Sequence, residues 1–331
     1  MKIGVIGSGS WGTALAQVLA DNGHDVLLYG VKESEINDIN QNHKNSCYFG
    51  DVEIAEVLHA TLDVRDLADY TDAFLLAVPT KFFADAIEKI KPFLAQKTLI
   101  INVAKGFSWD TDERLSVYIR KKLEGCRYGG VVSLVGPSHA EEVILRKLTA
   151  LCAVSCDQAA AETVQTLFSN RYIRVYTLND EAGAEYGVAM KNVIAIASGI
   201  LEGLGYGDNA KAALITRGLR EMVSYGVSKG GYAETFIGLT GIGDLIVTCF
   251  SPHSRNYRAG LAIGRQNSAD TLSESRETVE GVHSCLTIYR DAKALALEMP
   301  IVSAIYAVLY EKKEPSEALS AIMNRPLKKE N

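Results

Sequence analysis

The chain of 331 residues lacks an excess of positive charge. It carries 34 Lys and Arg against 40 Asp and Glu, which gives a net charge of -6 and a pI near 5.6. This balance excludes a general basic field that would attract DNA, RNA or an anionic membrane surface. We therefore expect no nucleic acid partner, and any phosphate group must be bound by a local cluster of donors.

Paired cysteines and long apolar runs are also missing. The six cysteines are scattered, with no CxxC pair and no histidine at metal-ligand spacing, so we predict reduced thiols and no metal. We expect that no apolar run reaches transmembrane length, and strand-like sequence already begins at Lys2, where a cleavable signal would stand. We therefore expect a cytoplasmic protein without membrane insertion.

A glycine motif opens the chain. A short apolar strand at residues 2–6 leads directly into Gly7-Ser8-Gly9-Ser10-Trp11-Gly12, which is followed by a helical pattern. Gly7 permits a tight turn, Gly9 lets the backbone approach a pyrophosphate, and Gly12 allows close packing of helix on strand. This context predicts a dinucleotide site. The alternatives are a glycine-rich turn without a ligand, or a flavin or methyl-donor site of similar geometry.

The end of the second predicted strand, residues 25–31, bears on the choice of cofactor. An NAD-selective site usually places a carboxylate there to accept from the ribose 2'-hydroxyl. This chain has Gly30-Val31-Lys32-Glu33 instead. Glu33 comes late for that role, and Lys32 would tolerate a 2'-phosphate. NAD and NADP therefore both stay open as the cofactor.

The order of apolar runs and helical patterns predicts the fold. Further strands are expected at residues 73–78, 98–103, 130–135, 149–154 and 171–176, with helical patterns at 81–93, 140–142 and 158–168. From residue 181 the pattern is helical, at 181–204, 210–229, 286–296 and 302–310, interrupted at 238–245 and 249–256. We predict an α/β protein: a Rossmann-type, doubly wound parallel sheet in a dinucleotide-binding domain (1–180), then an all-helical substrate-binding domain (181–331).

One cation stands inside a largely apolar helical run. Lys191 lies in the middle of residues 185–199, EYGVAMKNVIAIASG. Desolvation lowers the pKa of a fully buried lysine by roughly 3 to 5 units, which suits a proton donor or acceptor near neutrality. The alternatives are that the side chain reaches the surface or pairs with Glu185.

Other candidates follow strands or interrupt helices. Lys105 follows the strand at 98–103, where ligands of a parallel sheet collect, although it could also be an ordinary loop lysine. Ser138 is either the N-cap of a helix that begins at Ala140 or a donor to a ligand oxygen. Ser254-Arg255-Asn256 suits a phosphate, since each charge-assisted hydrogen bond contributes roughly 1.5 to 3 kcal/mol. A surface salt bridge is the alternative for Arg255.

Taken together, the motifs resemble those of the bacterial NAD(P)-dependent glycerol-3-phosphate dehydrogenase family. In chain order they are GSGSWGTALA, KG at 105–106, GPSHA, EYGVAMKNVIAIASGI, DNAKAALITRGL, GLTGIGDLIVTC, SPHSRN and VEG, between Ile3 and Gly281. The resemblance implies a Rossmann domain followed by a helical domain, and assembly as a homodimer.

The resemblance also implies an activity and the residues that perform it. The chain would interconvert dihydroxyacetone phosphate, a phosphorylated triose, and sn-glycerol 3-phosphate, and so feed phospholipid synthesis. Catalytic roles are implied for Lys191 as general acid/base, for Lys105 and for Asp244. Substrate contacts are implied for Lys105, Gly136, Ser138, Lys191, Asn192, Asp244, Thr248, Ser254, Arg255 and Asn256. With the glycine motif, the cofactor contacts are Gly7, Gly9, Ser10, Trp11, Gly12, Val31, Lys105, Ala140, Arg255 and Glu280; many family members carry Arg or His where Val31 stands.

The implied chemistry is physically consistent. Hydride arriving at C2 of the ketone leaves negative charge on oxygen, and Lys191 and Lys105 would supply a proton and stabilise that charge. The two ammonium groups oppose each other's charge while Asp244 favours it, so we expect coupled titration. The competing functions are a two-domain dehydrogenase of a hydroxy acid or ketopantoate, whose substrate is a carboxylate, and a non-catalytic dinucleotide-binding sensor.

Overall fold

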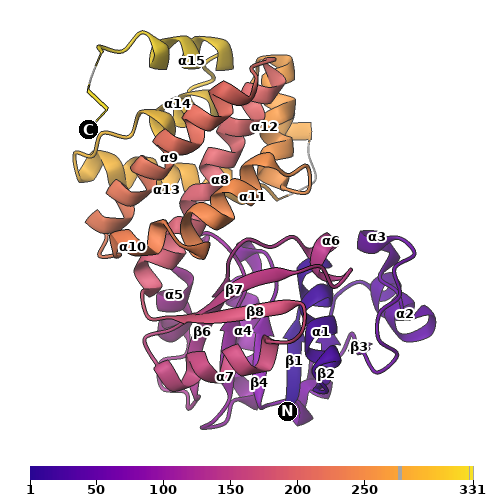
Figure 1. The fold of residues 1–331 in the computed structure, drawn as a ribbon. Helices are drawn as coiled ribbons and strands as arrows, with labels where there is room; N and C mark the ends of the chain where they lie inside the picture. Colours follow the sequence, from indigo (N-terminus) through magenta and orange to yellow (C-terminus); the bar gives the residue numbers. More distant parts are fainter. Residues whose placement is uncertain (275–277, 328, 331) are drawn as a thin grey trace. The chain divides into compact units, whose positions relative to one another are not determined.

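The computed structural model describes residues 1–274, 278–327 and 329–330 (Figure 1). The chain divides into two compact units, Met1–Glu185 and Tyr186–Asn331, and the boundary falls within helix α8 (Glu181–Gly203). Within the described ranges, the strands lie in the first unit and the second unit consists of helices and their connections. The predicted fold class is confirmed.

The first unit is built on an eight-stranded sheet with the order β3-β2-β1-β4-β5-β6-β7-β8. The strands are β1 (Lys2–Ile6), β2 (Asp25–Tyr29), β3 (His59–Thr61), β4 (Ala73–Leu76), β5 (Leu99–Asn102), β6 (Gly130–Val135), β7 (Thr149–Val154) and β8 (Ile173–Leu178). Strands β1 to β6 pair in parallel. Their order reverses between β1 and β4, and ligands of such sheets bind at the carboxyl ends of the strands beside this switch point.

One pair departs from the parallel pattern. Strand β7 runs antiparallel to β6, with Val154 opposite Ser133, while β8 runs parallel to β7. The connection from β6 to β7 contains only the four-residue helix α6 (Ala140–Val143), whereas β7 and β8 are joined through α7 (Gln158–Phe168). A parallel pair usually needs a full crossover helix, so the short connection returns the chain in the opposite direction.

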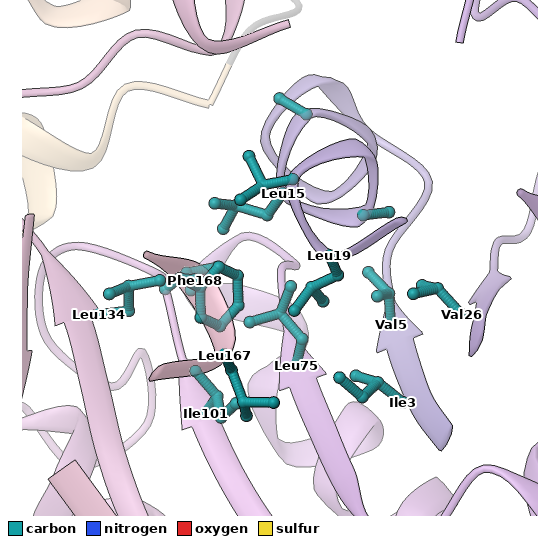
Figure 2. Packing of buried hydrophobic residues seen from close by; sticks show 14 of the residues in the cluster. Ile3, Val5, Leu15, Leu19, Val26, Leu75, Ile101, Leu134, Leu167 and Phe168 are labelled. Atoms are coloured by element: carbon teal, nitrogen blue, oxygen red, sulfur yellow. The ribbon is translucent and has the colours of Figure 1, made fainter. Parts of the chain in front are cut away.

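Helices cover both faces of this sheet because successive strand residues point to opposite sides. The main helices are α1 (Ser10–Asp21), α4 (Phe83–Ile90), α5 (Leu115–Lys122) and α7. On one face, Leu75 of β4 joins a buried cluster with Leu19 of α1 and Phe168 of α7 (Figure 2). On the other face, Phe74 of β4 joins a cluster with Phe83 of α4. The central strands are therefore apolar on both sides, as parallel strands usually are.

Residues 32–72 form elements that the sequence pattern does not predict. They are α2 (Glu33–Asn42), α3 (Ser46–Phe49), the edge strand β3 and a short 3-10 helix, η1 (Val64–Asp69). Helix α2 buries only Glu35, Ile36 and Ile39. A helix with so narrow an apolar face has a weak periodic signal. This segment nevertheless supplies side chains to the site described below.

The second unit contains helices from α8 onward. They are α9 (Asp208–Ser228), α10 (Ala233–Phe236), the π-helical turn η4 (Leu239–Gly243), α11 (Asp244–Phe250), α12 (Arg255–Gln266), η5 (Ala269–Glu274), α13 (Glu280–Ala294), α14 (Pro300–Tyr310) and α15 (Pro315–Met323). The two segments expected to interrupt the helices contain η4, α11 and the start of α12. In the first of them, Gly241 allows close packing, because a Cβ on it would lie 2.1 Å from the carbonyl oxygen of Phe236.

Glycines also bring α8 and α12 into backbone contact. A Cβ on Gly199 of α8 would lie 2.1 Å from the carbonyl oxygen of Tyr257, and one on Gly260 of α12 would lie 2.1 Å from that of Ile196. No side chain fits at either position. The close crossing places the N-terminus of α12 beside the middle of α8, where Lys191 lies.

One stretch of the described chain, Ala233–Phe250, is long and apolar enough to span a membrane by length and composition, with a mean hydropathy of 1.4. The expectation that no run reaches this length is therefore wrong. The stretch is not a single helix, because Ile237 and Gly238 separate α10 from η4. It is weak evidence for a membrane span, since the core helix of a soluble protein passes the same test.

Candidate active site

The loop between β1 and α1 has the backbone geometry that its glycines predict. Gly7 has a φ of +119°, and a Cβ on it would lie 2.6 Å from the carbonyl oxygen of Ala77. A Cβ on Gly12 would lie 2.0 Å from the carbonyl oxygen of Gly7. Both positions therefore require glycine. Gly9 is different, because the nearest atom to its missing Cβ is the Tyr48 hydroxyl, 4.0 Å away; a ligand can approach the backbone there.

The N-terminus of α1 suits an anion. Gly9 is its N-cap and has no side chain to bond the free N–H groups, and the first turn, which begins with Ser10 and Trp11, contains no acidic residue. The Nε1–H of Trp11 is buried and has no hydrogen-bond partner in the described part of the chain. Buried donors are normally satisfied, so this one fits a bound acceptor. These features fit a dinucleotide.

A charged cluster at the end of β2 was missed by sequence reasoning. Val31, the predicted cofactor contact there, has 75% of its surface exposed. Glu35 of α2 is buried instead, and its carboxylate accepts hydrogen bonds from Ser8 Oγ at 2.7 Å, Lys32 Nζ at 2.8 Å and Tyr48 Oη at 3.0 Å. The only local signal is the spacing of Lys32 and Glu35, which places them on one face of a helix.

Lys105, Gly136 and Ser138 meet at the carboxyl ends of the neighbouring strands β5 and β6. Lys105 Nζ donates to the carbonyl oxygen of Gly136 at 3.0 Å, and Ser138 Oγ donates to the same oxygen at 3.1 Å. Gly136 has a φ of +147°, and a Cβ on it would lie 3.1 Å from the carbonyl oxygen of Ala150. Glycine is favoured there because other residues rarely adopt this conformation.

Ser138 does not cap the helix that follows it, so that interpretation is wrong. The N-cap of α6 is His139, which makes no capping hydrogen bond, and the Ser138 hydroxyl turns back to Gly136. Ala140, a predicted cofactor contact, is the first residue of α6 and belongs to the buried cluster that includes α1. It therefore lies in the layer that also carries the glycine loop.

A buried polar network supports this region. Glu185 accepts hydrogen bonds from the backbone N–H of Ser116 at 3.0 Å, from Ser116 Oγ at 2.8 Å, from Ser133 Oγ at 3.0 Å and from Arg114 Nη1 at 3.1 Å. Burial raises the pKa of the Glu185 carboxyl. The alternative that Lys191 pairs with Glu185 is wrong, because Glu185 bonds to these residues of its own unit.

The same network continues to the residue before Lys105. Asn102 Nδ2 donates to Ser133 Oγ at 3.1 Å, and Asn102 Oδ1 accepts from the backbone N–H of Ala104 at 3.0 Å. The end of β5 is thereby fixed to β6, and the start of the Lys105 loop is held in place.

In the second unit, Lys191 is buried and bonded to two residues of α11. Its Nζ donates to Asp244 Oδ1 at 2.5 Å and to Thr248 Oγ1 at 2.8 Å. The Thr248 hydroxyl donates its own hydrogen to the backbone carbonyl of Asp244 at 2.6 Å, which leaves its oxygen free to accept from the ammonium. The alternative that Lys191 reaches the surface is therefore wrong.

Asn192 and Asn256 link three helices beside this pair. Asn256 Nδ2 donates to Asn192 Oδ1 at 2.9 Å, and Asn256 Oδ1 accepts from the backbone N–H of Gly281 at 2.9 Å. Both asparagines are buried. Ser254 is the N-cap of α12, where its Oγ accepts from the backbone N–H of Tyr257 at 3.2 Å. The starts of α12 and α13 are thus fixed against α8.

Arg255 forms a salt bridge with Glu280, which is the alternative to a phosphate contact. Its Nη2 lies 2.5 Å from Glu280 Oε1, and the arginine side chain is partly exposed. A guanidinium has five N–H donors, and one carboxylate oxygen does not occupy them all. The pair therefore leaves Arg255 with donors for an anion.

The remaining predicted chemistry concerns thiols and metals. All six cysteines are free, and burial raises the pKa of Cys152 to about 11 and that of Cys249 to about 12. Across residues 1–274, 278–327 and 329–330, no three His, Cys, Asp or Glu residues group so that they could hold a metal ion.

Comparison with known proteins identifies the family. The chain matches the NAD-dependent glycerol-3-phosphate dehydrogenase N-terminus over residues 2–161 and the C-terminus of the same family over residues 180–320. It is 45% identical over 330 residues to the glycerol-3-phosphate dehydrogenase (NAD(P)+) of Staphylococcus haemolyticus, with 99% of each chain covered. The corresponding protein of Listeria monocytogenes serotype 4a is 44% identical over 328 residues, with 99% of this chain and 97% of the relative covered.

A solved structure agrees with these relatives. The crystal structure of glycerol-3-phosphate dehydrogenase from Coxiella burnetii has a TM-score of 0.89 to this chain at 33% identity, and the match covers 98% of both chains. The resemblance predicted from the motifs is confirmed, and the alternative functions are not favoured. The chain belongs to the NAD-dependent glycerol-3-phosphate dehydrogenase family.

Proposed function

We propose that this chain is an oxidoreductase that interconverts dihydroxyacetone phosphate and sn-glycerol 3-phosphate with NAD or NADP, as the names of its relatives suggest. The observation that carries the proposal is the buried contact of Lys191 with Asp244 and Thr248 in a member of this family. Residues 1–180 would bind the dinucleotide and residues 181–331 the substrate. In the cell, a cytoplasmic homodimer would supply glycerol 3-phosphate for phospholipid synthesis.

The glycine loop supports binding of the dinucleotide. When bound, NAD(P)H supplies the hydride that reduces the ketone. The N–H groups at the start of α1, from Ser10 onward, would donate to the pyrophosphate, and the open space at Gly9 would admit it. The unpartnered Nε1–H of Trp11 would donate to the cofactor. The other proposed cofactor contacts are Gly7, Gly12, Val31, Lys105, Ala140, Arg255 and Glu280.

Lys191 would hold the proton that the reaction requires. Reduction at C2 leaves negative charge on the ketone oxygen, which must take up one proton. The Lys191 ammonium carries such a proton on Nζ, and Asp244 and Thr248 fix the position of that nitrogen. Lys105 would stabilise the developing charge as a second ammonium group.

The N-terminus of α12 would bind the substrate phosphate. Its first turn contains Arg255 and Asn256 and no acidic residue, and Ser254 is its N-cap. Backbone N–H groups at a helix N-terminus and a guanidinium both suit a phosphate. Gly136, Ser138, Asn192 and Thr248 complete the proposed substrate contacts.

The proposed function is tested by oxidation of NADH and of NADPH with dihydroxyacetone phosphate, beside ketopantoate and acetoacetate as controls. We expect rapid turnover with the phosphorylated ketone alone, because the proposed site recognises a phosphate. No turnover with it, in a protein that binds the nucleotide, would contradict the proposal. Turnover confined to ketopantoate or acetoacetate would instead support a dehydrogenase of a carboxylate substrate.

A further inference from the structure

The end of β2 has no room for the carboxylate that NAD-binding folds usually place there. The residue that follows the strand is Gly30, and a Cβ on it would lie 2.3 Å from Ser8 Oγ and 2.8 Å from Ser8 Cβ. The Ser8 side chain therefore fills the space that an Asp or Glu at this position would need. A carboxylate for the ribose 2'-hydroxyl must come from elsewhere in the chain.

Glu35 brings a carboxylate to this place from the first turn of α2. It is buried, and Ser8, the residue that excludes a side chain at position 30, donates to its Oε2. Its Oε1 accepts from Lys32 Nζ and from the Tyr48 hydroxyl. A buried carboxylate with three donors is fixed in position, as a recognition group needs to be.

This cluster is tied to the proposed dinucleotide loop rather than to the outer surface of α2. The backbone N–H of Gly7 donates to the carbonyl oxygen of Tyr29, the last residue of β2, at 2.8 Å. Asn45, beside α3, donates through Nδ2 to the carbonyl oxygen of Ser8 at 2.8 Å and to Thr13 Oγ1 at 2.9 Å. Because Ser8 of this loop also donates to Glu35, the carboxylate lies beside the place where the adenosine half of a dinucleotide would bind.

Lys32 is the cation beside this carboxylate. Its side chain is 58% exposed while that of Glu35 is 5% exposed, so the ammonium lies on the outer side of the pair. It also lies 5.8 Å from the centre of the Tyr48 ring. The hydrogen bond to Glu35 raises the pKa of Lys32, so the lysine is charged at neutral pH. A 2'-phosphate would compete with Glu35 for this ammonium.

We infer that Glu35 sets the nucleotide selectivity of this chain, by supplying the carboxylate that β2 cannot carry and by holding Lys32 as its ion-pair partner. The inference rests on the proposed function, because it assigns a role within the same cofactor site. In this chain, the Glu35 carboxylate would accept a ribose 2'-hydroxyl, and the ion pair would offer a 2'-phosphate only a partly neutralised cation. In a variant that lacks the Glu35 carboxylate, the Lys32 ammonium would be available to a 2'-phosphate. The nucleotide preference would then shift toward the 2'-phosphorylated form.

The test measures binding of 2',5'-ADP and of 5'-AMP to the full-length protein by calorimetry at low ionic strength. We expect Glu35→Gln to raise the ratio of the affinity for 2',5'-ADP to that for 5'-AMP by roughly fivefold or more, since one charge beside the phosphate is removed. Lys32→Met should lower this ratio by a similar factor. The matched control is Glu33→Gln, which makes the same charge change on an exposed residue of the same helical turn.

Equal ratios in Glu35→Gln and Glu33→Gln would overturn the inference, because the charge of α2 would then act only through the general field. If Glu35→Gln does not fold, Lys32→Met decides: an unchanged ratio in that variant would show that the pair does not recognise the 2'-position. These binding measurements use nucleotide fragments and no substrate. A negative result in them would overturn the role of Glu35 alone. A wild-type protein that does not turn over dihydroxyacetone phosphate would instead contradict the proposed function.

Discussion

Two lysine–carboxylate pairs in the second unit differ in their contact with water. Lys191 pairs with Asp244, and Lys211 of α9 pairs with Glu202 of α8. Both lysines are buried, at 4% and 7% exposure, but Asp244 is 0% exposed while the Glu202 side chain is 42% exposed. We call the Lys191–Asp244 pair sealed and the Lys211–Glu202 pair open. Burial of a lysine therefore does not by itself mark a catalytic candidate. The two lysines differ in whether the carboxylate that each contacts is also buried.

The difference has energetic consequences. When one partner of a sealed pair is removed, the other charge stays buried without compensation, which costs about 3 to 5 kcal/mol. A pair that reaches solvent contributes about 0 to 1 kcal/mol, because water replaces either partner. In the open pair, the hydrogen bond to Glu202 raises the pKa of Lys211.

The largest expected effect separates the two lysines by activity. Lys191→Ala should lower kcat with dihydroxyacetone phosphate by roughly 10²- to 10⁴-fold, the usual contribution of a general acid or base. Lys211→Ala removes an equally buried lysine from the same unit and should leave kcat nearly unchanged. Steady-state kinetics at saturating substrate, with calorimetric binding of the cofactor to each folded variant, measures both. Similar kcat values in the two variants would remove the catalytic distinction between the pairs.

Glu221 of α9 extends the comparison to a buried charge held by backbone groups. Its Oε1 accepts from the backbone N–H of Ile301 at 2.7 Å and its Oε2 from that of Val302 at 3.1 Å, at the start of α14. Burial raises the pKa of this carboxyl to about 7; the charge of Glu298 adds to the rise and that of Arg325 opposes it. Two backbone donors thus compensate the charge less well than an ammonium would.

The raised pKa makes the free energy of unfolding depend on pH. In the unfolded chain a Glu has a pKa of about 4.3. Between pH 4.3 and about 7, the Glu221 carboxyl therefore binds a proton more tightly in the folded protein than in the unfolded chain. The contribution of Glu221 to stability is therefore complete below about pH 4.3 and is lost as pH rises to 7, by up to about 3 kcal/mol. Glu221→Gln removes this titration, so the variant should become more stable relative to the wild type as pH rises.

Urea unfolding of both proteins between pH 4.5 and 7.5 measures this effect. Glu311→Gln is the control, because Glu311 is exposed at the other end of α14 and its substitution makes the same charge change away from Glu221. If the unfolding free energies of Glu221→Gln and the wild type run parallel over the pH range, Glu221 is charged in the folded protein throughout. Backbone donors would then compensate a buried carboxylate as well as a lysine does.

Lys191 could be predicted from the sequence because a cation is conspicuous in an apolar run of helical length. Its partner could not be predicted from the residues alone, since Asp244 lies on another helix and no spacing rule connects α8 with α11. Lys211 is buried almost as deeply, although the sequence pattern at residues 208–217, with Asp208, Asn209 and Arg217 around it, does not mark it as a candidate. The sequence thus indicates which charges need compensation, and tertiary packing determines what compensates them.

The same limit applies to the sheet unit. Strands such as β4 and β5 were predicted because parallel strands buried on both faces are continuous apolar runs. The direction of β7 was not, because it depends on how far the short connection through α6 can reach. Glu35 was missed for a related reason: it lies on a polar helix, and only the folded chain shows that Ser8 excludes a side chain from position 30.

The smallest expected effect concerns the open pair. Glu202→Gln keeps the size of the side chain and removes its charge, and water can solvate Lys211 in its place, so the free energy of unfolding should fall by no more than about 1 kcal/mol. The loss should shrink as salt is added, because exposed charges are screened. Asp244→Asn, in the sealed pair, should cost several times more and respond little to salt. Urea unfolding of both variants at low and high ionic strength measures this contrast. A large, salt-independent loss in Glu202→Gln would mean that the partial exposure of Glu202 does not let water compensate its partner, and the distinction between a sealed and an open pair would fail.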